Sequence, residues 1–143
     1  MDAPLNVVGD KVLVPTSYLD REKAGERALY CLDAATGETV WKADVALNPW
    51  GGASVSPDGS VAVVPGSTVG YYFNEIRGAK GDLTAIDMKT GKPRWHKAVP
   101  GGVVGCVAIA DGLAVCTATD GKVRAYKLAD GERALLYLSL IHI

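Results

Sequence analysis

The sequence predicts an all-β chain of about three four-stranded antiparallel units. Three observations lead to this prediction: an eleven-residue pattern that recurs along the chain, a two-residue turn that precedes each copy, and the composition. The 143 residues include 17 Gly and 7 Pro but only 1 Phe and 2 Met. Such a turn-rich composition, together with many Val residues, argues against a helical protein.

The recurring pattern is clearest in two segments that lie 54 residues apart. Residues 31–41 and 85–95 carry Asp, Thr, Gly and Trp at the same offsets. These residues are Asp33, Thr36, Gly37 and Trp41 in the first copy, and Asp87, Thr90, Gly91 and Trp95 in the second. A degenerate third copy at 125–135 keeps Gly131 but has Leu135 in the position of Trp. A repeat of this kind indicates stacked units of similar structure.

Each copy is preceded by a short hairpin signal. The pairs are Gly9-Asp10, Asp58-Gly59 and Asp111-Gly112, each between apolar runs, and such pairs favour two-residue turns. The pattern predicts strands at 5–9, 11–16, 27–33 and 39–45, then 52–57, 60–65, 81–88 and 93–98, then 102–110, 112–118, 122–128 and a damaged strand from about 133. Four strands in 40–50 residues are typical of a β-propeller blade. We therefore expect a partial β-propeller with blades at 3–45, 51–99 and, incomplete, 101–137.

The residue types of the pattern suit a turn followed by an outer strand. The Asp and Thr side chains can accept hydrogen bonds from N–H groups of the turn. Gly37 and Gly91 are expected at positive φ, which costs other residues about 1 kcal/mol or more. Trp41 and Trp95 then lie on the outer strand, where an indole can fill the gap between two blades.

This spacing resembles the tryptophan-docking motif of pyrroloquinoline-quinone-type propeller repeats, and the resemblance covers residues 3–135. Quinoprotein alcohol dehydrogenases carry the motif, and so do non-catalytic propeller lipoproteins. The resemblance implies seven or eight blades in the whole fold and a periplasmic or other extracytoplasmic location. No signal peptide is visible in the first residues.

Enzymes of the resembled family use a quinone, a Ca²⁺ held by Glu, Asn and Asp, an Asp base and often two adjacent cysteines. Here the cysteines are far apart, and Asp33 and Asp87 are expected to serve the turns. Glu75 and Asp82 have no recognisable ligand pattern. We therefore expect a non-catalytic scaffold that binds a protein or small ligand. The alternative is a fragment of a pyrroloquinoline-quinone-dependent alcohol or sugar dehydrogenase, whose quinone and Ca²⁺ would be held by blades outside this chain.

Two long connections and one joint are expected at the same end of the blades. The connections are 17–26 and 66–80, and the joint carries Trp50 in an Asn-Pro-Trp-Gly-Gly segment. Loops on a rigid scaffold concentrate binding residues. The candidate binding loop consists of aromatic and basic residues, namely Trp50, Tyr71, Tyr72, Phe73 and Arg77. In the alternative interpretation these aromatic residues fold back as a local cover of the blade edge.

The cysteines and His96 are interpreted as structural. With a two-residue turn at 111–112, Cys106 would lie opposite Thr117, and the Cys106 and Cys116 thiols would then point to opposite faces. A three-residue turn with a bulge would set them opposite each other. Buried thiols without a disulfide are favoured, and His96 is expected to face away from Trp95.

Composition argues against two classes of partner, nucleic acid and a membrane that the chain would span. A net charge of −1 gives no electrostatic footprint for nucleic acid, and no apolar run is long enough for a membrane span.

Residues 138–143 resemble a translated transposase end used in sequencing libraries, and we expect them to be a sequencing-adapter artefact. The alternative is an apolar strand at 135–143. Three blades cannot close a ring, so the isolated chain is expected to self-associate.

Overall fold

The computed structural model describes residues 3–70 and 72–138. They form three four-stranded antiparallel sheets, which confirms the predicted all-β fold. The first sheet contains β1 (Asn6–Val8), β2 (Lys11–Leu19), β3 (Ala24–Asp33) and β4 (Thr39–Asp44). The middle sheet contains β5 (Ser54–Val55), β6 (Val61–Ser67), β7 (Gly81–Asp87) and β8 (Pro93–Val99). The last sheet contains β9 (Ala108–Ala110), β10 (Leu113–Thr117), β11 (Lys122–Lys127) and β12 (Arg133–Leu138).

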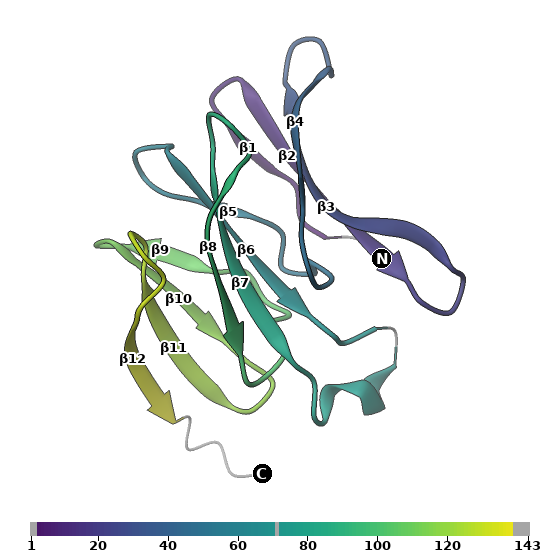
Figure 1. Cartoon of the computed structure of the whole chain (residues 1–143), viewed down its shortest axis with the longest axis vertical. Coiled ribbons are helices and arrows are strands. Elements are labelled where there is room, and N and C mark those ends of the chain that lie inside the picture. Colours follow the sequence, from purple (N-terminus) through teal and green to yellow (C-terminus); the bar gives the residue numbers. More distant parts are fainter. Residues whose placement is uncertain (1–2, 71, 139–143) are drawn as a thin grey trace.

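Each sheet is a meander in which neighbouring strands follow one another in sequence. The three sheets lie side by side, with the middle sheet between the other two (Figure 1). Turns between the first and second and between the third and fourth strands lie at one end of the stack, the turn end. The connections between the second and third strands, and the joints between sheets, lie at the opposite end, the loop end. The only helical element in the described residues is the 3₁₀ turn η1 (Phe73–Ile76) at the loop end.

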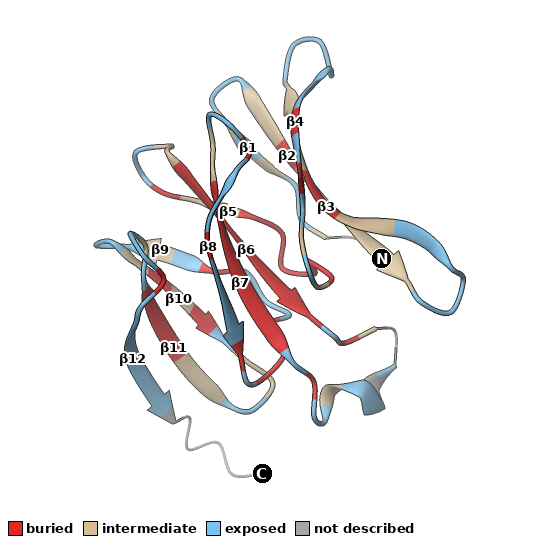
Figure 2. Ribbon diagram, viewed as in Figure 1, coloured by how far each residue is buried: buried red, intermediate tan, exposed pale blue. Residues whose placement is uncertain are grey.

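The core consists of two layers, one on each side of the middle sheet. Toward the first sheet, Ala62, Val64 and Ile86 pack against a group that includes Leu13 and Leu29. Toward the last sheet, the core residues include Val63, Leu83, Ala85, Val103, Ala114 and Cys116. The strands β6 and β7 are consequently buried on both faces, whereas β12 is exposed (Figure 2). Alternate side chains of the middle sheet therefore serve different neighbours, which explains its continuous apolar sequence.

The structure corrects one of the predicted connections and two of the predicted strands. The segment 17–26 is mostly strand, because β2 and β3 extend their pairing to Leu19↔Ala24 and leave only residues 20–23 as a turn. The damaged fourth strand of the last unit is instead a regular strand, β12, with a bulge opposite Ala125/Tyr126. The first strand of that unit begins only at Ala108. The segment before it is irregular, since Gly102 bonds to Thr119 in another connection.

The register of the last sheet decides between the two turns considered for residues 111–112. Leu113 pairs with Ala110, as expected for a two-residue turn. Cys31 and Cys116 are buried, but Cys106 is exposed, so the expectation of three buried thiols is wrong for Cys106. It lies in the irregular segment ahead of β9, where no sheet covers it. Of the suspected artefact, only Leu138 belongs to the described residues, as the end of β12.

Candidate functional site: the loop end of the sheets

The Asp and Thr of the repeated pattern act within their own turns. The Asp33 carboxylate accepts hydrogen bonds from the N–H groups of Ala35 and Thr36, at 3.0 Å each. Asp87 accepts the equivalent pair in the middle sheet and is also bonded by Arg94. The Arg94 bond, followed by the turn N–H groups, lowers the pKa of Asp87 to about 2. These carboxylates are therefore fully used as hydrogen-bond acceptors in the turns.

Each Trp of the pattern contacts the turn of the following sheet. The Trp41 indole donates a 2.8 Å hydrogen bond from Nε1 to the Met88 carbonyl, and Trp95 donates one of the same length to Leu128. The rings lie over Gly91 and Gly131, where an added Cβ would come within 2.8 and 2.7 Å of the indoles. Glycine is thus required at these two positions for two reasons: the backbone has a positive φ, and the indole ring approaches too closely for a side chain.

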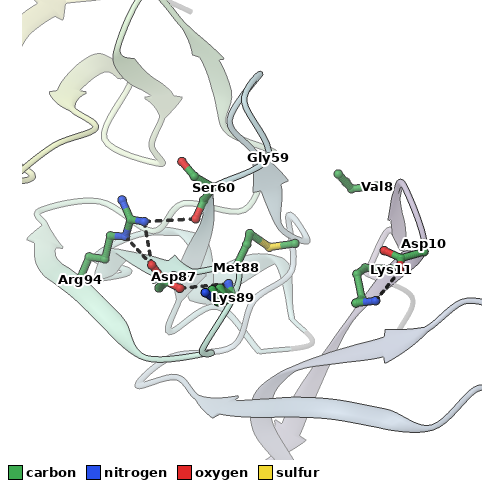
Figure 3. A pocket seen from close by; sticks show the side chains of 9 residues that line it. All are labelled: Val8, Asp10, Lys11, Gly59, Ser60, Asp87, Met88, Lys89 and Arg94. Carbon is green, nitrogen blue, oxygen red and sulfur yellow. Dashed lines mark hydrogen bonds and ion pairs between the residues drawn. The ribbon is translucent and has the colours of Figure 1, made fainter.

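A hollow at the turn end lies between the first and middle sheets (Figure 3). On one side Lys11 bonds to Asp10 at 2.8 Å, and on the other Arg94 bonds to Asp87 at 2.7 Å. Arg94 also donates to the Ser60 carbonyl at 3.4 Å. Positive and negative groups are thus paired within each wall. The hollow is formed by the turns of the two sheets. Its charged groups do not form a patch of one sign that would attract a charged ligand.

At the loop end, the connection from Ser67 to Lys80 is fixed to the scaffold at its base. Thr68 donates its N–H to the Lys80 carbonyl at 2.9 Å, and Lys80 donates its own N–H to the Thr68 hydroxyl at 2.9 Å. The indole of Trp50 donates to the Val69 carbonyl at 2.5 Å. Trp50 is only 7% exposed. Because it lies beneath the connection, Trp50 supports this loop and is not part of its exposed surface.

The tip of the same connection is ordered by one carboxylate. The Glu75 side chain accepts hydrogen bonds from the N–H groups of Gly70 and Tyr72, at 2.8 and 2.9 Å. An added Cβ at Gly70 would lie 2.9 Å from Glu75 Oε2, so a side chain at this position would displace the Glu75 carboxylate. Glu75, considered from the sequence as a ligand candidate, therefore holds the loop backbone around η1.

A contact between two sheets completes the loop-end surface. Arg21, in the turn of the first sheet, donates from Nη1 to the Tyr72 hydroxyl of the middle sheet at 2.5 Å. Between them lies a hollow that is also lined by Tyr18, Asp20, Glu22, Thr68 and Glu75. Tyr72 is 48% exposed and Arg77 is exposed nearby. Tyr71 lies outside the described residues, and of Phe73 only the backbone is described, as the first residue of η1.

Asn48 is a key residue that the sequence argument did not identify. It is buried, and its side chain both accepts from the Tyr18 N–H and donates to the Tyr18 carbonyl, at 3.0 and 3.1 Å. Arg27 donates to the same side chain at 3.1 Å. The Asn48 backbone in turn pairs with Ser67. Asn48 thus joins the long hairpin of the first sheet to the base of the loop. The only feature of the sequence that could have indicated this role is its position directly before Pro49 and Trp50.

Asp82 of β7 and His96 of β8 form a pair in the middle sheet, beside Ala46 and Leu47 of the joint between sheets. His96 Nε2 lies 2.9 Å from Asp82 Oδ2, with His96 about half exposed and Asp82 buried. Burial raises the pKa of Asp82 above its usual value, and the bond to His96 opposes this shift. His96 is held by a strand neighbour, which supports a structural role for both residues.

Potential metal-ligating side chains are dispersed in the described part of the chain. No group of three or more His, Cys, Asp or Glu side chains gathers in residues 3–70 and 72–138. Cys106 is exposed while Cys116 is buried, and burial raises the pKa of the Cys116 thiol to about 11. Across these same residues, no helix has the length and apolar character needed to cross a membrane.

The repeated sheets, the positive-φ turns and the docked indoles define the chain as a propeller repeat protein of the type with a tryptophan on the outer strand. Comparison with known proteins makes this specific. The family model described as outer membrane protein assembly factor BamB matches residues 5–135, and the chain belongs to this family. The predicted resemblance to pyrroloquinoline-quinone-type propeller repeats is thereby confirmed.

One curated relative is the outer membrane protein assembly factor BamB of Shewanella oneidensis, which is 27% identical over 105 residues. The match covers 73% of this chain but 26% of the relative, so the chain spans about a quarter of its length. The crystal structure of BamB from Moraxella catarrhalis superposes with a TM-score of 0.74 at 16% identity, covering 99% of this chain and 37% of that one. A quinohemoprotein alcohol dehydrogenase from Comamonas testosteroni gives a TM-score of 0.61 at 19% identity, covering 95% and 20%. These structures show the shared fold.

Proposed function

We propose that this chain is part of a non-catalytic propeller that presents its loop end to a protein partner. The observation that supports the proposal is that hydrogen bonds fix the loop at this end at both its base and its tip. The loop is pinned at its base by Trp50 and Thr68 and ordered at its tip by Glu75. Tyr72 and Arg77 remain on the exposed side. A fixed loop loses little conformational entropy on binding, and aromatic and Arg side chains are enriched in protein interfaces.

The family adds support for a protein partner, since its printed description is that of an assembly factor for outer membrane proteins. By the same resemblance we propose a location outside the cytoplasm. The remaining sequence prediction, a small ligand, has less support, because the hollow beside Tyr72 is lined largely by charged residues that already bond to the protein, such as Arg21 and Glu75.

Site-specific photocrosslinking in native cells tests this proposal. A photoreactive amino acid is placed at Asn74 or Arg77 at the loop end, and at Ala35 or Lys89 at the turn end as matched exposed controls. We expect one protein to be crosslinked from the loop-end positions only, and Arg77→Glu to reduce the yield from position 74 severalfold. Crosslinking from the turn end alone would contradict the proposal.

The alternative, a piece of a quinone-dependent dehydrogenase, has fold-level support from structural neighbours that are themselves dehydrogenases. It requires donors that the described residues do not gather. Titration of the full-length protein, including the blades outside this chain, with pyrroloquinoline quinone in the presence of Ca²⁺, followed by the absorbance of the quinone, distinguishes the two. We expect no saturable change, and a saturable change at micromolar quinone would favour the alternative.

A further inference from the structure

The two interfaces between neighbouring sheets are built alike, so equivalent positions can be compared between them. Trp41 lies over Gly91 at the first interface, and Trp95 lies over Gly131 at the second. Each indole also donates a 2.8 Å hydrogen bond to a backbone carbonyl of the following sheet. A polar residue that occurs at only one of two equivalent positions is therefore not required by this packing.

Three positions beside the first indole are apolar. They are Ala43 on β4, Ile86 on β7 and Pro93 on β8. Ala43 and Ile86 are buried in the core, and Ile86 pairs with Pro93 next to a bulge. Packing and strand pairing thus account for these three residues.

At the second interface the same three positions carry Lys97, Tyr126 and Arg133. Lys97 lies two residues beyond the Trp of its strand, as Ala43 does. Tyr126 pairs with Arg133 next to a bulge, like the apolar pair of the middle sheet. All three line a hollow of about 390 Å³ between the middle and last sheets, each of which has four strands. The other residues that line it are Ala98, Pro100, Gly131 and Glu132.

The positive charges of this hollow are unpaired, unlike those of the hollow at the turn end. Neither Lys97 nor Arg133 forms an ion pair with a residue in 3–70 or 72–138, and both side chains are exposed. The stem of Lys97 packs beside the turn of the last sheet, since its Cε would lie 3.0 Å from a Cβ added at Gly131. Among the lining residues, Glu132 is already bonded by Lys127 at 2.9 Å. The hollow therefore attracts an anion.

Tyr126 supplies a third donor from the wall of the hollow. It is 4% exposed, and its hydroxyl has no hydrogen-bond partner in the part of the chain that the structure describes. Burial raises the pKa of this hydroxyl, so it stays protonated at neutral pH and can donate. Buried polar groups usually have a partner, and an acceptor that enters the hollow would provide one.

We propose that this hollow binds a phosphate group, with Lys97, Tyr126 and Arg133 as the hydrogen-bond donors. A phosphate presents several acceptor oxygens in different directions and can accept from three side chains of two sheets, whereas a carboxylate presents two oxygens in one plane. Arg and Lys are also the usual phosphate-binding side chains of proteins. A soluble phosphate and a lipid headgroup share this chemistry, and the experiment below distinguishes them. The proposal is independent of the loop-end function, since the loop of residues 68–80 does not line this hollow.

Isothermal titration calorimetry of the full-length protein with inorganic phosphate tests the proposal at neutral pH. At an ionic strength of about 0.05 M, where screening is weak, we expect one site with a dissociation constant below about 1 mM. Cosedimentation with vesicles of phosphatidylcholine, with and without phosphatidic acid, forms the second arm. Binding of inorganic phosphate assigns the site to a soluble ligand, and binding of the phosphatidic acid vesicles alone assigns it to a lipid headgroup. Either result supports the proposal, and no binding in both arms overturns it.

Two variants and one control locate the binding. Lys97→Ala introduces the residue that the first interface has at this position, and Tyr126→Phe removes only the hydroxyl, so both are expected to fold, which far-UV circular dichroism verifies. Each should raise the dissociation constant at least about tenfold, as the loss of one charge-assisted hydrogen bond implies. Lys89→Ala removes an exposed lysine from a turn of the middle sheet and should change it less than about twofold. Equal weakening by Lys89→Ala and Lys97→Ala would overturn the proposal, and so would acetate that binds as tightly as phosphate.

Discussion

Truncation of Trp95 to alanine is the sharpest test of the interface between the middle and last sheets. The residue is only 8% exposed and donates its indole N–H to Leu128. An indole buries about 200 Å², which corresponds to about 5 kcal/mol at about 25 cal/mol per Å². Measured truncations of Trp or Phe in cores cost about 3–5 kcal/mol. We expect a loss of about 4 kcal/mol, which is a large part of the 5–15 kcal/mol that is typical of a whole domain.

Urea unfolding followed by far-UV circular dichroism measures this loss, because the signal does not depend on tryptophan fluorescence. Protein concentration is held constant, since association changes apparent stability. Trp95→Phe keeps most of the apolar area but removes the N–H, and should cost about 1–2 kcal/mol. Leu136→Ala, at an exposed site on the neighbouring sheet, should change stability by less than about 1 kcal/mol. The reasoning is refuted if Trp95→Ala is no worse than this control, or if Trp95→Phe is as damaging as Trp95→Ala.

Three further outcomes are expected. Gly91→Ala should lower the melting temperature more than Gly37→Ala, since both glycines have positive φ but only Gly91 is covered by an indole; equal shifts would contradict the docking argument. In the last sheet the buried Arg124 forms an ion pair of 2.5 Å with Asp120. Asp120→Ala should therefore cost about 3 kcal/mol in urea unfolding and more than Arg124→Met, because it leaves a buried guanidinium unpaired; the reverse order would count against this account. The pKa of Asp87 is lowered to about 2, so the ionised carboxylate contributes to the free energy of unfolding above pH 4, and this contribution is lost as the pH falls toward 2. Between pH 4 and pH 2 the free energy of unfolding should therefore fall less steeply in Asp87→Asn than in the unmodified chain. An unchanged slope would show that the turn does not depend on the charge.

The sheets could be predicted because each depends on local signals. The Asp-Gly turns and the recurring Asp, Thr, Gly and Trp are short-range patterns, and the strands built on them agree with the structure to within a few residues, apart from the first strand of the last unit and the extended β2–β3 hairpin. That hairpin was expected as an open connection, because its pairing is fixed by Asn48, which is far away in sequence. Contacts of this kind leave no local pattern.

The position of the candidate residues in the fold was predictable, but their surroundings were not. The aromatic residues of the long connection lie at the loop end, as the strand order predicts, yet the sequence could not show which of them face solvent. Trp50 lies beneath the loop because its indole reaches the Val69 carbonyl, nineteen residues away in the chain. Glu75 has no recognisable ligand pattern in the sequence, and its carboxylate is engaged by backbone N–H groups of its own loop, which the sequence did not predict. Both outcomes depend on how the loop folds back on the joint between sheets.

The central claim of this account is that three indoles hold the scaffold and its loop together. Trp41 and Trp95 are bonded to backbone carbonyls of the next sheet, and Trp50 is bonded to the loop. Hydrogen exchange of the indole N–H groups, followed by NMR on protein labelled with ¹⁵N-tryptophan and assigned by single Trp→Phe variants, tests this directly. The account predicts three separate signals, all exchanging much more slowly than free tryptophan. Exchange of the Trp41 or Trp95 signal at the rate of free tryptophan would contradict it.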